Sequence, residues 1–251
     1  MKSVKKVLGC LRKADNDYAL INDGDRICVG VSGGKDSSVL LYCLNLYKQF
    51  SKKDYEIIPV YCDMGFGNQG IDDLVEYFRK LGIEIRIYET RIAEILQLHP
   101  TNAGRLSCSL CSKLRKGAII NAAKELGCNK LAFAHHNDDA LETLFMNMIH
   151  GGKVATFKPN TYLDKSGMIL IRPLIYAYEK DIIRFASQLE MPISKNLCGN
   201  DGVTERQNMK ELLKSIYHQY PQARDNFALM LRNHRQLSLF EPADEEDEES
   251  E

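Results

Sequence analysis

The segment GVSGGKDSS, residues 30–38, constrains the fold of this 251-residue chain more than any other. Residues 26–31 are mostly apolar and β-branched, which predicts a short buried strand. From residue 37 to 47 the apolar residues recur close to helical spacing, so a helix should begin at or near Asp36. A glycine-rich loop between a strand and a helix points backbone N–H groups and the positive end of the helix dipole at one anion. The segment therefore predicts a phosphate site.

The residues of this loop have separate chemical uses at such a site. Gly33 and Gly34 allow positive φ angles and a close approach of phosphate to the backbone. Lys35 adds a positive charge, and Ser32 and Ser37 add hydroxyl donors. A glycine-rich turn that binds nothing is the competing interpretation.

The spacing is not that of a Walker A sequence, because three residues rather than four separate Gly30 from Gly34, and Asp36 follows the lysine. The run SGGKDS, residues 32–37, instead resembles the pyrophosphate loop of the PP-loop ATP α-hydrolases. That family includes tRNA sulfur-transfer enzymes, lysidine synthetase and amide-forming synthetases, which attach AMP to a substrate oxygen and release pyrophosphate. The resemblance implies that the loop holds the pyrophosphate of ATP, with Lys35 and Asp36 as catalytic residues.

Predicted strands and helices alternate along the chain. The strands fall at 26–31, 55–62, 83–88 and 130–134, and the intervening helices at 37–47, 71–81, 92–98, 113–126 and 138–149. Such alternation predicts an α/β fold with a doubly wound parallel sheet, whose ligands bind beyond the carboxyl ends of the strands. Residues 100–109 read as a loop, and residues 153–172 as an irregular excursion with one strand at 168–171.

Further helices are predicted at 178–189, 204–217 and 221–234. With the resemblance, this order implies a Rossmann-like PP-loop ATPase fold with a helical C-terminal region. We expect one domain over residues 1–237: an N-terminal helix at about 1–22, a core at about 25–200 and closing helices at about 203–235.

The acidic residues are unevenly distributed. The last eleven residues hold eight acids and no bases, so 33 basic and 26 acidic residues remain over 1–240, a net charge of +7. The tail, residues 241–251, should be disordered because it cannot bury enough apolar surface to order itself. The basic remainder permits RNA as a partner, although a solvated lysine-rich surface explains it equally well. The sequence shows no long uncharged apolar run typical of a membrane span and no signal-peptide pattern, so we expect a soluble cytoplasmic protein.

The stretch HHNDDALET, residues 135–143, follows the last predicted strand of the core. Capping of a helix by Asn137, Asp138 or Asp139 is the purely structural interpretation, worth about 0.5–2 kcal/mol. The resemblance implies instead that these acids place magnesium and the nucleotide. We expect Asp139 to bind Mg²⁺, Asp138 to cap the helix, and His135 or His136 to anchor the backbone or lie near adenine. Adjacent histidines project in different directions, so zinc is not expected.

The eight cysteines fall into two sets. Five lie in or beside apolar segments and read as small buried hydrophobes: Cys10, Cys28, Cys43, Cys62 and Cys128. Of these, Cys62 is also placed among the nucleotide-binding residues. The others are Cys108 and Cys111, in a CxxC motif, and Cys198. An isolated CxxC has four possible interpretations: a redox pair, half of a zinc site, iron–sulfur ligands, or coincidence.

No fourth cysteine stands at metal spacing beside Cys198, where Lys195 occupies the place that a second CxxC would need. Three cysteines suit a cluster with one open iron better than a closed zinc site. The segments CSLCSKLRKG, HHNDDALET, RPL and NLCG…RQNMKELL together resemble the tRNA 2-thiocytidine synthetase group, over about residues 4–237. That resemblance implies a 4Fe–4S cluster on Cys108, Cys111 and Cys198. Lys113 and Arg115 would face phosphate or RNA, or form a solvated helix face.

The implied reaction is ATP-dependent tRNA thiolation. The C2 oxygen of cytidine 32 in the anticodon loop is adenylated with Mg²⁺, and sulfide delivered on the cluster then displaces AMP. A cysteine desulfurase or free sulfide would supply sulfur, and the chain could pair as a homodimer. A PP-loop tRNA ligase or amide-forming synthetase without a cluster is the alternative enzyme, and an ATP-binding redox sensor the alternative without catalysis.

Overall fold

The computed structural model describes residues 2–67, 70–101, 106–194, 205–233 and 239. Two predictions fall outside this part of the chain: the position of Cys198 and the disorder of the acidic tail, residues 241–251. Within it, no helix is long and apolar enough to cross a membrane.

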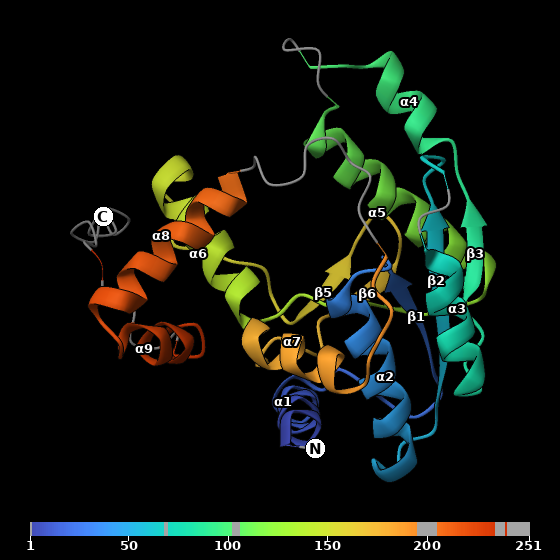
Figure 1. The fold of residues 1–251 in the computed structure, drawn as a ribbon, viewed down its shortest axis with the longest axis horizontal. Helices are drawn as coiled ribbons and strands as arrows, with labels where there is room; N and C mark the ends of the chain where they lie inside the picture. Colours follow the sequence, from blue (N-terminus) through green and yellow to red (C-terminus); the bar gives the residue numbers. More distant parts are fainter. Residues whose placement is uncertain (1, 68–69, 102–105, 195–204, 234–238, 240–251) are drawn as a thin grey trace, which may run out of the picture.

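A six-stranded sheet with the order β3-β2-β1-β4-β6-β5 forms the centre of the fold (Figure 1). Its strands are β1 Asp25–Val31, β2 Tyr55–Asp63, β3 Arg86–Glu89, β4 Lys130–Ala132, β5 Asn160–Leu163 and β6 Met168–Ile171. All neighbouring pairs are parallel except β5 and β6, which form an antiparallel hairpin. The predicted doubly wound α/β fold is confirmed, but β5 was not predicted, and the sheet is therefore mixed at one edge.

The helices largely follow the predicted ranges. They are α1 Lys2–Tyr18, α2 Lys35–Phe50, α3 Ile71–Lys80, α4 Ile92–Leu98, α5 Cys108–Glu125, α6 Asn137–Gly151, α7 Glu179–Gln188, α8 Glu205–Gln219 and α9 Ala223–Met230. The largest difference is at α5, which begins at Cys108 rather than at residue 113. Ser107 caps it, because the Ser107 hydroxyl accepts a hydrogen bond from the backbone N–H of Leu110 at 3.3 Å. A single domain over residues 1–237 remains a proposal.

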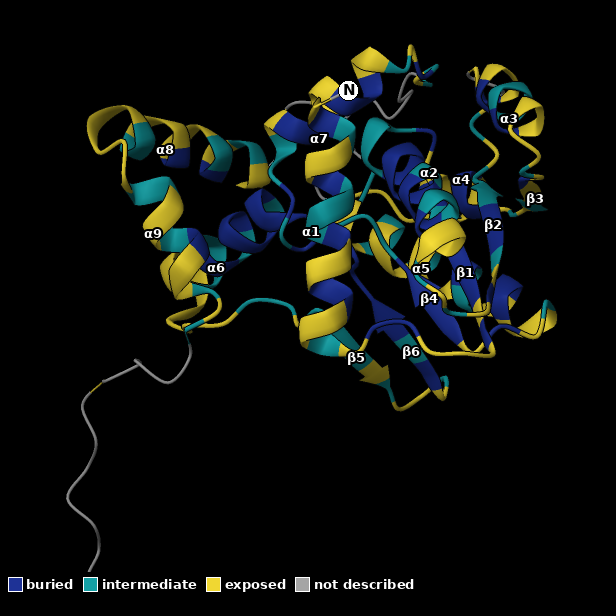
Figure 2. Ribbon diagram, turned by 90° about the horizontal axis from the view of Figure 1, so that it is seen from below, coloured by how far each residue is buried: buried dark blue, intermediate teal, exposed yellow. Residues whose placement is uncertain are grey.

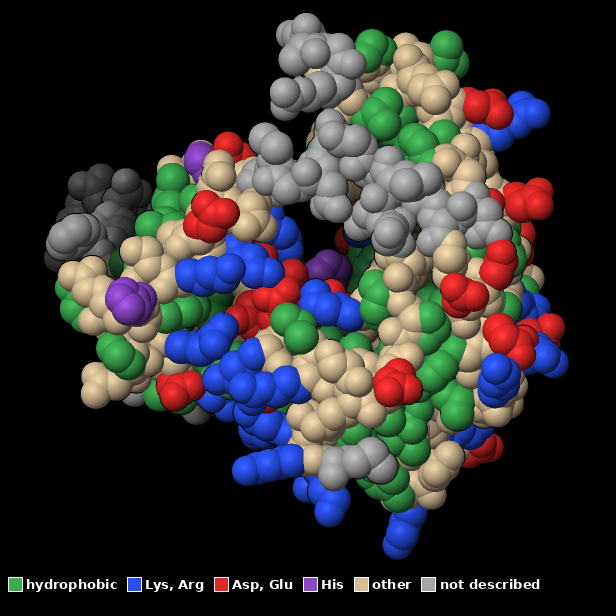
Figure 3. Space-filling view, viewed as in Figure 1, with side chains coloured by type: hydrophobic (Ala, Val, Ile, Leu, Met, Phe, Trp, Pro, Cys, Tyr) green, Lys and Arg blue, Asp and Glu red, His purple; other side chains and the backbone are tan. Residues whose placement is uncertain are grey.

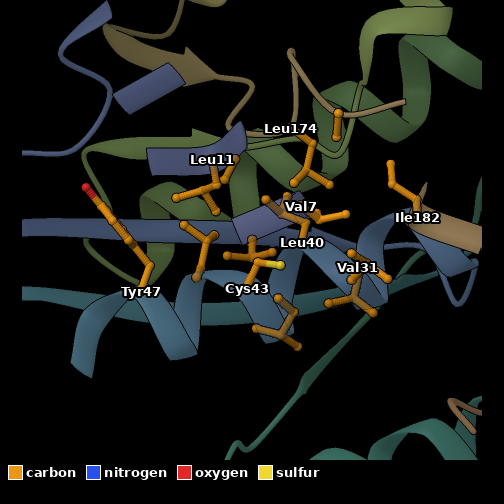
Figure 4. Close-up of a cluster of buried hydrophobic side chains, with 14 of the residues drawn as sticks. Val7, Leu11, Val31, Leu40, Cys43, Tyr47, Leu174 and Ile182 are labelled. Atoms are coloured by element: carbon orange, nitrogen blue, oxygen red, sulfur yellow. The ribbon is translucent and has the colours of Figure 1, made fainter. Parts of the chain in front are cut away.

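Two clusters of buried apolar side chains form the core. Figure 2 shows that the central strands are largely buried, with helices packed around them. On one face the core comes from α1, α2, α3 and α7; Figure 4 shows Val7 and Leu11 of α1 packed beside Leu40 and Cys43 of α2. On the other face, α5 buries Ile119, Ala122 and Ala123 against the sheet. Because helices lie on both faces, the connections after β1 and β4 leave a crevice at the carboxyl ends of these adjacent strands.

A helical lobe stands beside the sheet. Helices α8 and α9 pack on α6, which leaves the carboxyl end of β4 through a short turn. In Figure 1 this lobe lies across from α4 and α5, with the strand ends between them. The closing helices therefore bring side chains from far along the sequence toward the edge where the glycine-rich loop lies.

Candidate functional site

A cavity of about 660 Å³ opens at the carboxyl ends of the central strands, and Figure 3 shows a hollow there with charged and histidine side chains around it. Its walls come from the glycine-rich loop, β2, α5, the start of α6, β6 and α8. They bring together predicted site residues that are far apart in sequence: Ser32, Asp36, Cys62, Cys108, Cys111 and Asp139. The loop, the CxxC and the HHNDD stretch therefore contribute side chains to one cavity.

Hydrogen bonds within the glycine-rich loop fix its shape. The backbone N–H of Ser32 donates to the Ser37 hydroxyl at 3.0 Å, and that hydroxyl donates to the Gly34 carbonyl at 3.0 Å. Gly33 has a φ of +82°, and its carbonyl accepts a hydrogen bond from the Ser194 N–H at 3.0 Å. A Cβ at Gly33 would lie 1.8 Å from the Ser194 hydroxyl oxygen, so the position requires glycine.

Lys35, the first residue of α2, is shared between two carboxylates. Its Nζ lies 3.2 Å from an oxygen of Asp36 and 3.2 Å from an oxygen of Glu179 in α7. Burial by itself lowers the pKa of Lys35, but these two carboxylates raise it overall, so the ammonium stays charged. Glu179 also accepts from Lys210 of α8 at 2.7 Å. Sequence analysis did not identify Glu179 or Lys210.

The helix start at α6 differs from its predicted arrangement. His136 is the N-cap, and its backbone N–H donates to Asp139 at 2.9 Å while its ring accepts from the Asp139 N–H at 3.4 Å. Asp138, predicted to cap this helix, instead accepts from the N–H of Glu179 and from Arg224, both at 2.7 Å. The capping prediction for Asp138 was therefore wrong: its carboxylate ties α6 to the first residue of α7 and to α9.

The carboxylates of Asp36 and Asp139 face the same imidazole. The Nε2 of His136 lies 3.8 Å from Asp36 Oδ1 and 3.4 Å from Asp139 Oδ2. Asp36 Oδ1 is buried and has no hydrogen-bond partner among the described residues. Carboxylate oxygens beside a phosphate-binding loop are the ligands that Mg²⁺ prefers, so this unpartnered oxygen fits a cation brought by the nucleotide.

Arg206 of α8 closes one side of the cavity. Its guanidinium lies 2.9 Å from Asp139 Oδ1 and 3.6 Å from Glu142. Burial, followed by the charge of Asp139, raises the pKa of Glu142 to about 7. The RQNMKELL segment had been linked to the site by resemblance alone, and the structure shows that two of its cations, Arg206 and Lys210, form ion pairs with acids around the cavity.

His135 lies on the cavity wall among aromatic rings. Its ring centroid is 5.0 Å from that of Phe157 and 6.0 Å from that of Phe133. Burial lowers the pKa of His135 to about 4, so the imidazole is neutral at pH 7. Its Nδ1 is buried and has no hydrogen-bond partner among the described residues. A neutral ring in an apolar setting is suited to contact with a base.

Cys108 and Cys111 lie on the first turn of α5, at the cavity wall, with Cys108 exposed and Cys111 half-buried. The third predicted ligand, Cys198, lies outside the described residues, and within them no three Cys, His, Asp or Glu side chains are grouped to hold a metal ion. Arg115 and Lys116 are the cations of this helix that line the cavity, whereas Lys113 does not line it.

The remaining cysteines follow the prediction in part. Cys28, Cys43 and Cys128 are buried, whereas Cys10 and Cys62 are only half-buried. Cys62 lines the cavity at the end of β2, and burial raises its pKa to about 11, so it is a neutral thiol there.

This fold and loop define a PP-loop protein, and the family model described as PP-loop domain matches residues 10–211. The chain therefore belongs to the PP-loop family. The tRNA-cytidine(32) 2-sulfurtransferase of Aliivibrio fischeri (strain MJ11) is 41% identical over 221 residues, 88% of this chain and 72% of that protein. The protein of the same name from Azoarcus sp. (strain BH72) is 39% identical over 230 residues, 91% of this chain and 75% of that protein.

A solved structure shares the fold over nearly the whole chain. The U34-tRNA thiolase NcsA from Methanococcus maripaludis, with its 4Fe-4S cluster, superposes with a TM-score of 0.74. The match covers 94% of this chain and 80% of that one at 22% sequence identity, a level at which it concerns the fold.

Proposed function

We propose that this protein is an ATP-dependent tRNA sulfurtransferase that replaces the C2 oxygen of cytidine 32 with sulfur. One observation carries the proposal: the pyrophosphate loop and the CxxC of α5 line the same cavity. Relatives about 40% identical over most of the chain are named for this reaction. A PP-loop ligase that uses nitrogen would have no need of thiols beside its nucleotide.

The loop residues suit the first half of the reaction, in which the C2 oxygen attacks the α-phosphorus and pyrophosphate leaves. Backbone N–H groups at the start of α2 face the phosphates, and Lys35 offsets the charge that develops on the leaving group. The unpartnered oxygen of Asp36, with Asp139 beside it, would hold Mg²⁺ against the phosphates. Ser32, Gly33, Gly34 and Ser37 form the cradle itself.

The thiols suit the second half, in which AMP is displaced. We propose Cys108, Cys111 and Cys198 as ligands of a 4Fe–4S cluster, since thiolates are the ligands that such clusters require. The structural neighbour contains a cluster of this kind. When bound with one iron open, the cluster would supply sulfur to the activated base. Cys62, His135, His136 and Asp138 complete the proposed nucleotide surroundings.

The partners follow from this chemistry. The substrate is tRNA, whose target base must leave its stack to enter the cavity. We propose a cysteine desulfurase or free sulfide as sulfur source, a homodimer as assembly state, and the cytoplasm, where tRNA is modified, as location.

The deciding experiment is mass spectrometry of tRNA nucleosides from a deletion strain that is complemented with wild-type or variant genes. Wild type should restore 2-thiocytidine, whereas Cys108→Ala, Cys111→Ala and Cys198→Ala should not. Cys43→Ala, at a buried position of the core, is the matched control and should restore it.

Anaerobic iron and sulfide analysis of the same purified variants separates the rival functions. Loss of both elements together in each of the three variants supports one shared cluster. Full cluster content and normal thiolation in Cys198→Ala would end the three-ligand model. Thiolation that survives in all three variants would show that sulfur transfer needs no cluster on these cysteines, whereas a wild-type gene that restores no 2-thiocytidine would favour the ligase. ADP rather than AMP as the product of ATP would contradict the pyrophosphate loop.

A further inference from the structure

The cavity contains a buried cation that the steps above do not use. Arg172, from the RPL segment, follows β6 and lines the cavity, yet only 8% of its surface is exposed. No carboxylate of the described residues lies within 4.0 Å of its guanidinium. A buried arginine remains charged, so this one lacks the counter-ion that would offset its desolvation.

Only one side of the guanidinium has protein partners. Nη1 donates to the Lys158 carbonyl and to the Thr161 hydroxyl, the latter at 3.2 Å, which anchors the β5–β6 hairpin. Nε is buried without a hydrogen-bond partner, and Nη2 makes no hydrogen bond to a described residue. The Nε–Nη2 edge, which presents two parallel N–H groups, is therefore unpaired among the described residues. Because Nε is buried, a ligand reaches this edge only after neighbouring side chains shift.

Aromatic rings surround Arg172. The Phe157 ring lies 4.7 Å from the guanidinium carbon, and the neutral His135 ring packs against the same phenylalanine. Burial lowers the pKa of Arg172 to about 10, with no acid acting in the opposite direction. The rings of Phe133 and His135 line the same cavity as Arg172, and aromatic rings beside two donors suit an unstacked base with two neighbouring acceptors.

Cytosine has such an edge. Its N3 and O2 atoms are adjacent acceptors, whereas uracil carries a hydrogen on N3 and so places a donor between its two oxygens. The two N–H groups of a guanidinium side-on to cytosine can donate to N3 and O2. With uracil, one of these N–H groups would face the N3–H donor, so that hydrogen bond is lost. The arrangement distinguishes the two pyrimidines by hydrogen bonding alone.

We propose that Arg172 is the residue that selects the target base, by donating from Nε and Nη2 to N3 and O2 of cytosine. The base lies on the β4–β6 side of the cavity, and the phosphates of ATP lie on the β1 side. O2 keeps its second lone pair for the attack on the α-phosphorus. The inference rests on the proposed function and adds to it the means by which cytosine is recognised.

The test measures binding of anticodon stem-loop RNAs to the full-length protein, purified anaerobically and saturated with a non-hydrolysable ATP analogue. Position 32 carries cytidine, uridine or 3-deazacytidine, in which a C–H replaces the N3 acceptor. A bidentate arginine contact discriminates by about 1–3 kcal/mol, so wild type should bind cytidine about 5- to 150-fold more tightly than either alternative.

Arg172→Lys keeps the charge and loses the fork, so the three RNAs should bind with nearly equal affinity while ATP affinity is unchanged. Arg184→Met removes an exposed arginine that does not line the cavity and should keep the wild-type ratio. Equal binding of cytidine and 3-deazacytidine by wild type would overturn the proposal, even if Arg172→Lys fails to fold. So would a wild-type ratio in Arg172→Lys. Selective binding of cytidine with no thiolation would refute the proposed function separately.

Discussion

Gly33→Ala should damage the pyrophosphate loop through two separable effects. Gly33 has a φ of +82°, and an added Cβ would lie 1.8 Å from the Ser194 hydroxyl oxygen and 3.1 Å from its Cβ. Gly24 offers a matched control, because it has a φ of +80° but a Cβ there would meet nothing within 4 Å. Gly24→Ala therefore reports the backbone cost alone.

A left-handed conformation costs an alanine about 1–2 kcal/mol, which is the expected loss of unfolding free energy for Gly24→Ala. Overpacking adds about 1–3 kcal/mol. Gly33→Ala should therefore lose about 2–5 kcal/mol. Ser194→Ala removes the oxygen responsible for the closest contact, so the double variant Gly33→Ala/Ser194→Ala should recover most of the overpacking cost.

Urea unfolding of the four variants and wild type measures these terms, and calorimetric titration with ATP measures the effect on the site. Only the variants with Gly33→Ala should lose ATP affinity, since Gly24 lies at the opposite end of β1. The reasoning fails if Gly24→Ala and Gly33→Ala lose equal stability, or if Ser194→Ala brings no recovery.

Three further outcomes are expected. Lys35→Ala should lower the rate of pyrophosphate release by one to several orders of magnitude with folding intact, because it removes a charge aimed at the leaving group; an unchanged rate would exclude that role. His135 takes up its proton near pH 4 when folded but near 6.5 when unfolded, so its contribution to stability falls as pH drops through that window. Glu142 keeps its proton up to about pH 7 when folded against 4.5 when unfolded, so its contribution falls as pH rises through that range. His135→Gln and Glu142→Gln should remove these opposite slopes, as urea midpoints between pH 4 and 8 would show. Truncation after Phe240 should leave thiolation intact and tighten tRNA binding in filter assays, because it removes eight acids; loss of folding would contradict a solvating tail.

Local patterns predicted the fold well where they were strong. The segment at residues 30–38 contains the end of a buried strand, two adjacent glycines and a helix start. These signals depend only on residues that are close in sequence. Alternation of strands and helices gave the doubly wound sheet for the same reason. The edge strand β5 was missed because its four residues are only partly buried and alternate weakly.

Features that depend on contacts between distant segments could not be predicted. Lys35 forms an ion pair with Glu179, and Asp139 with Arg206. The partners are far apart in sequence, so no local sequence pattern indicates these contacts. Asp139 rather than Asp138 takes part in the cap of α6 for a local reason. His136 rather than the predicted Asp138 is the N-cap, and the earlier helix start places Asp139 at the third helical position, where a capping box needs its side chain.

Because Lys35 is already paired with carboxylates, ATP binding requires phosphate to replace a carboxylate at this lysine. Before nucleotide arrives, Asp36 and Glu179 already neutralise the lysine, and Lys210 neutralises Glu179 in turn. A triphosphate must displace these carboxylates from Lys35, because the site has little net positive charge before binding. Long-range electrostatic attraction therefore contributes little to the association rate of ATP. The displaced Asp36 then needs a cation of its own. ATP that arrives as its magnesium complex satisfies both requirements in one event, whereas free ATP leaves a carboxylate facing phosphate, which gives the site a built-in preference for the metal-bound nucleotide.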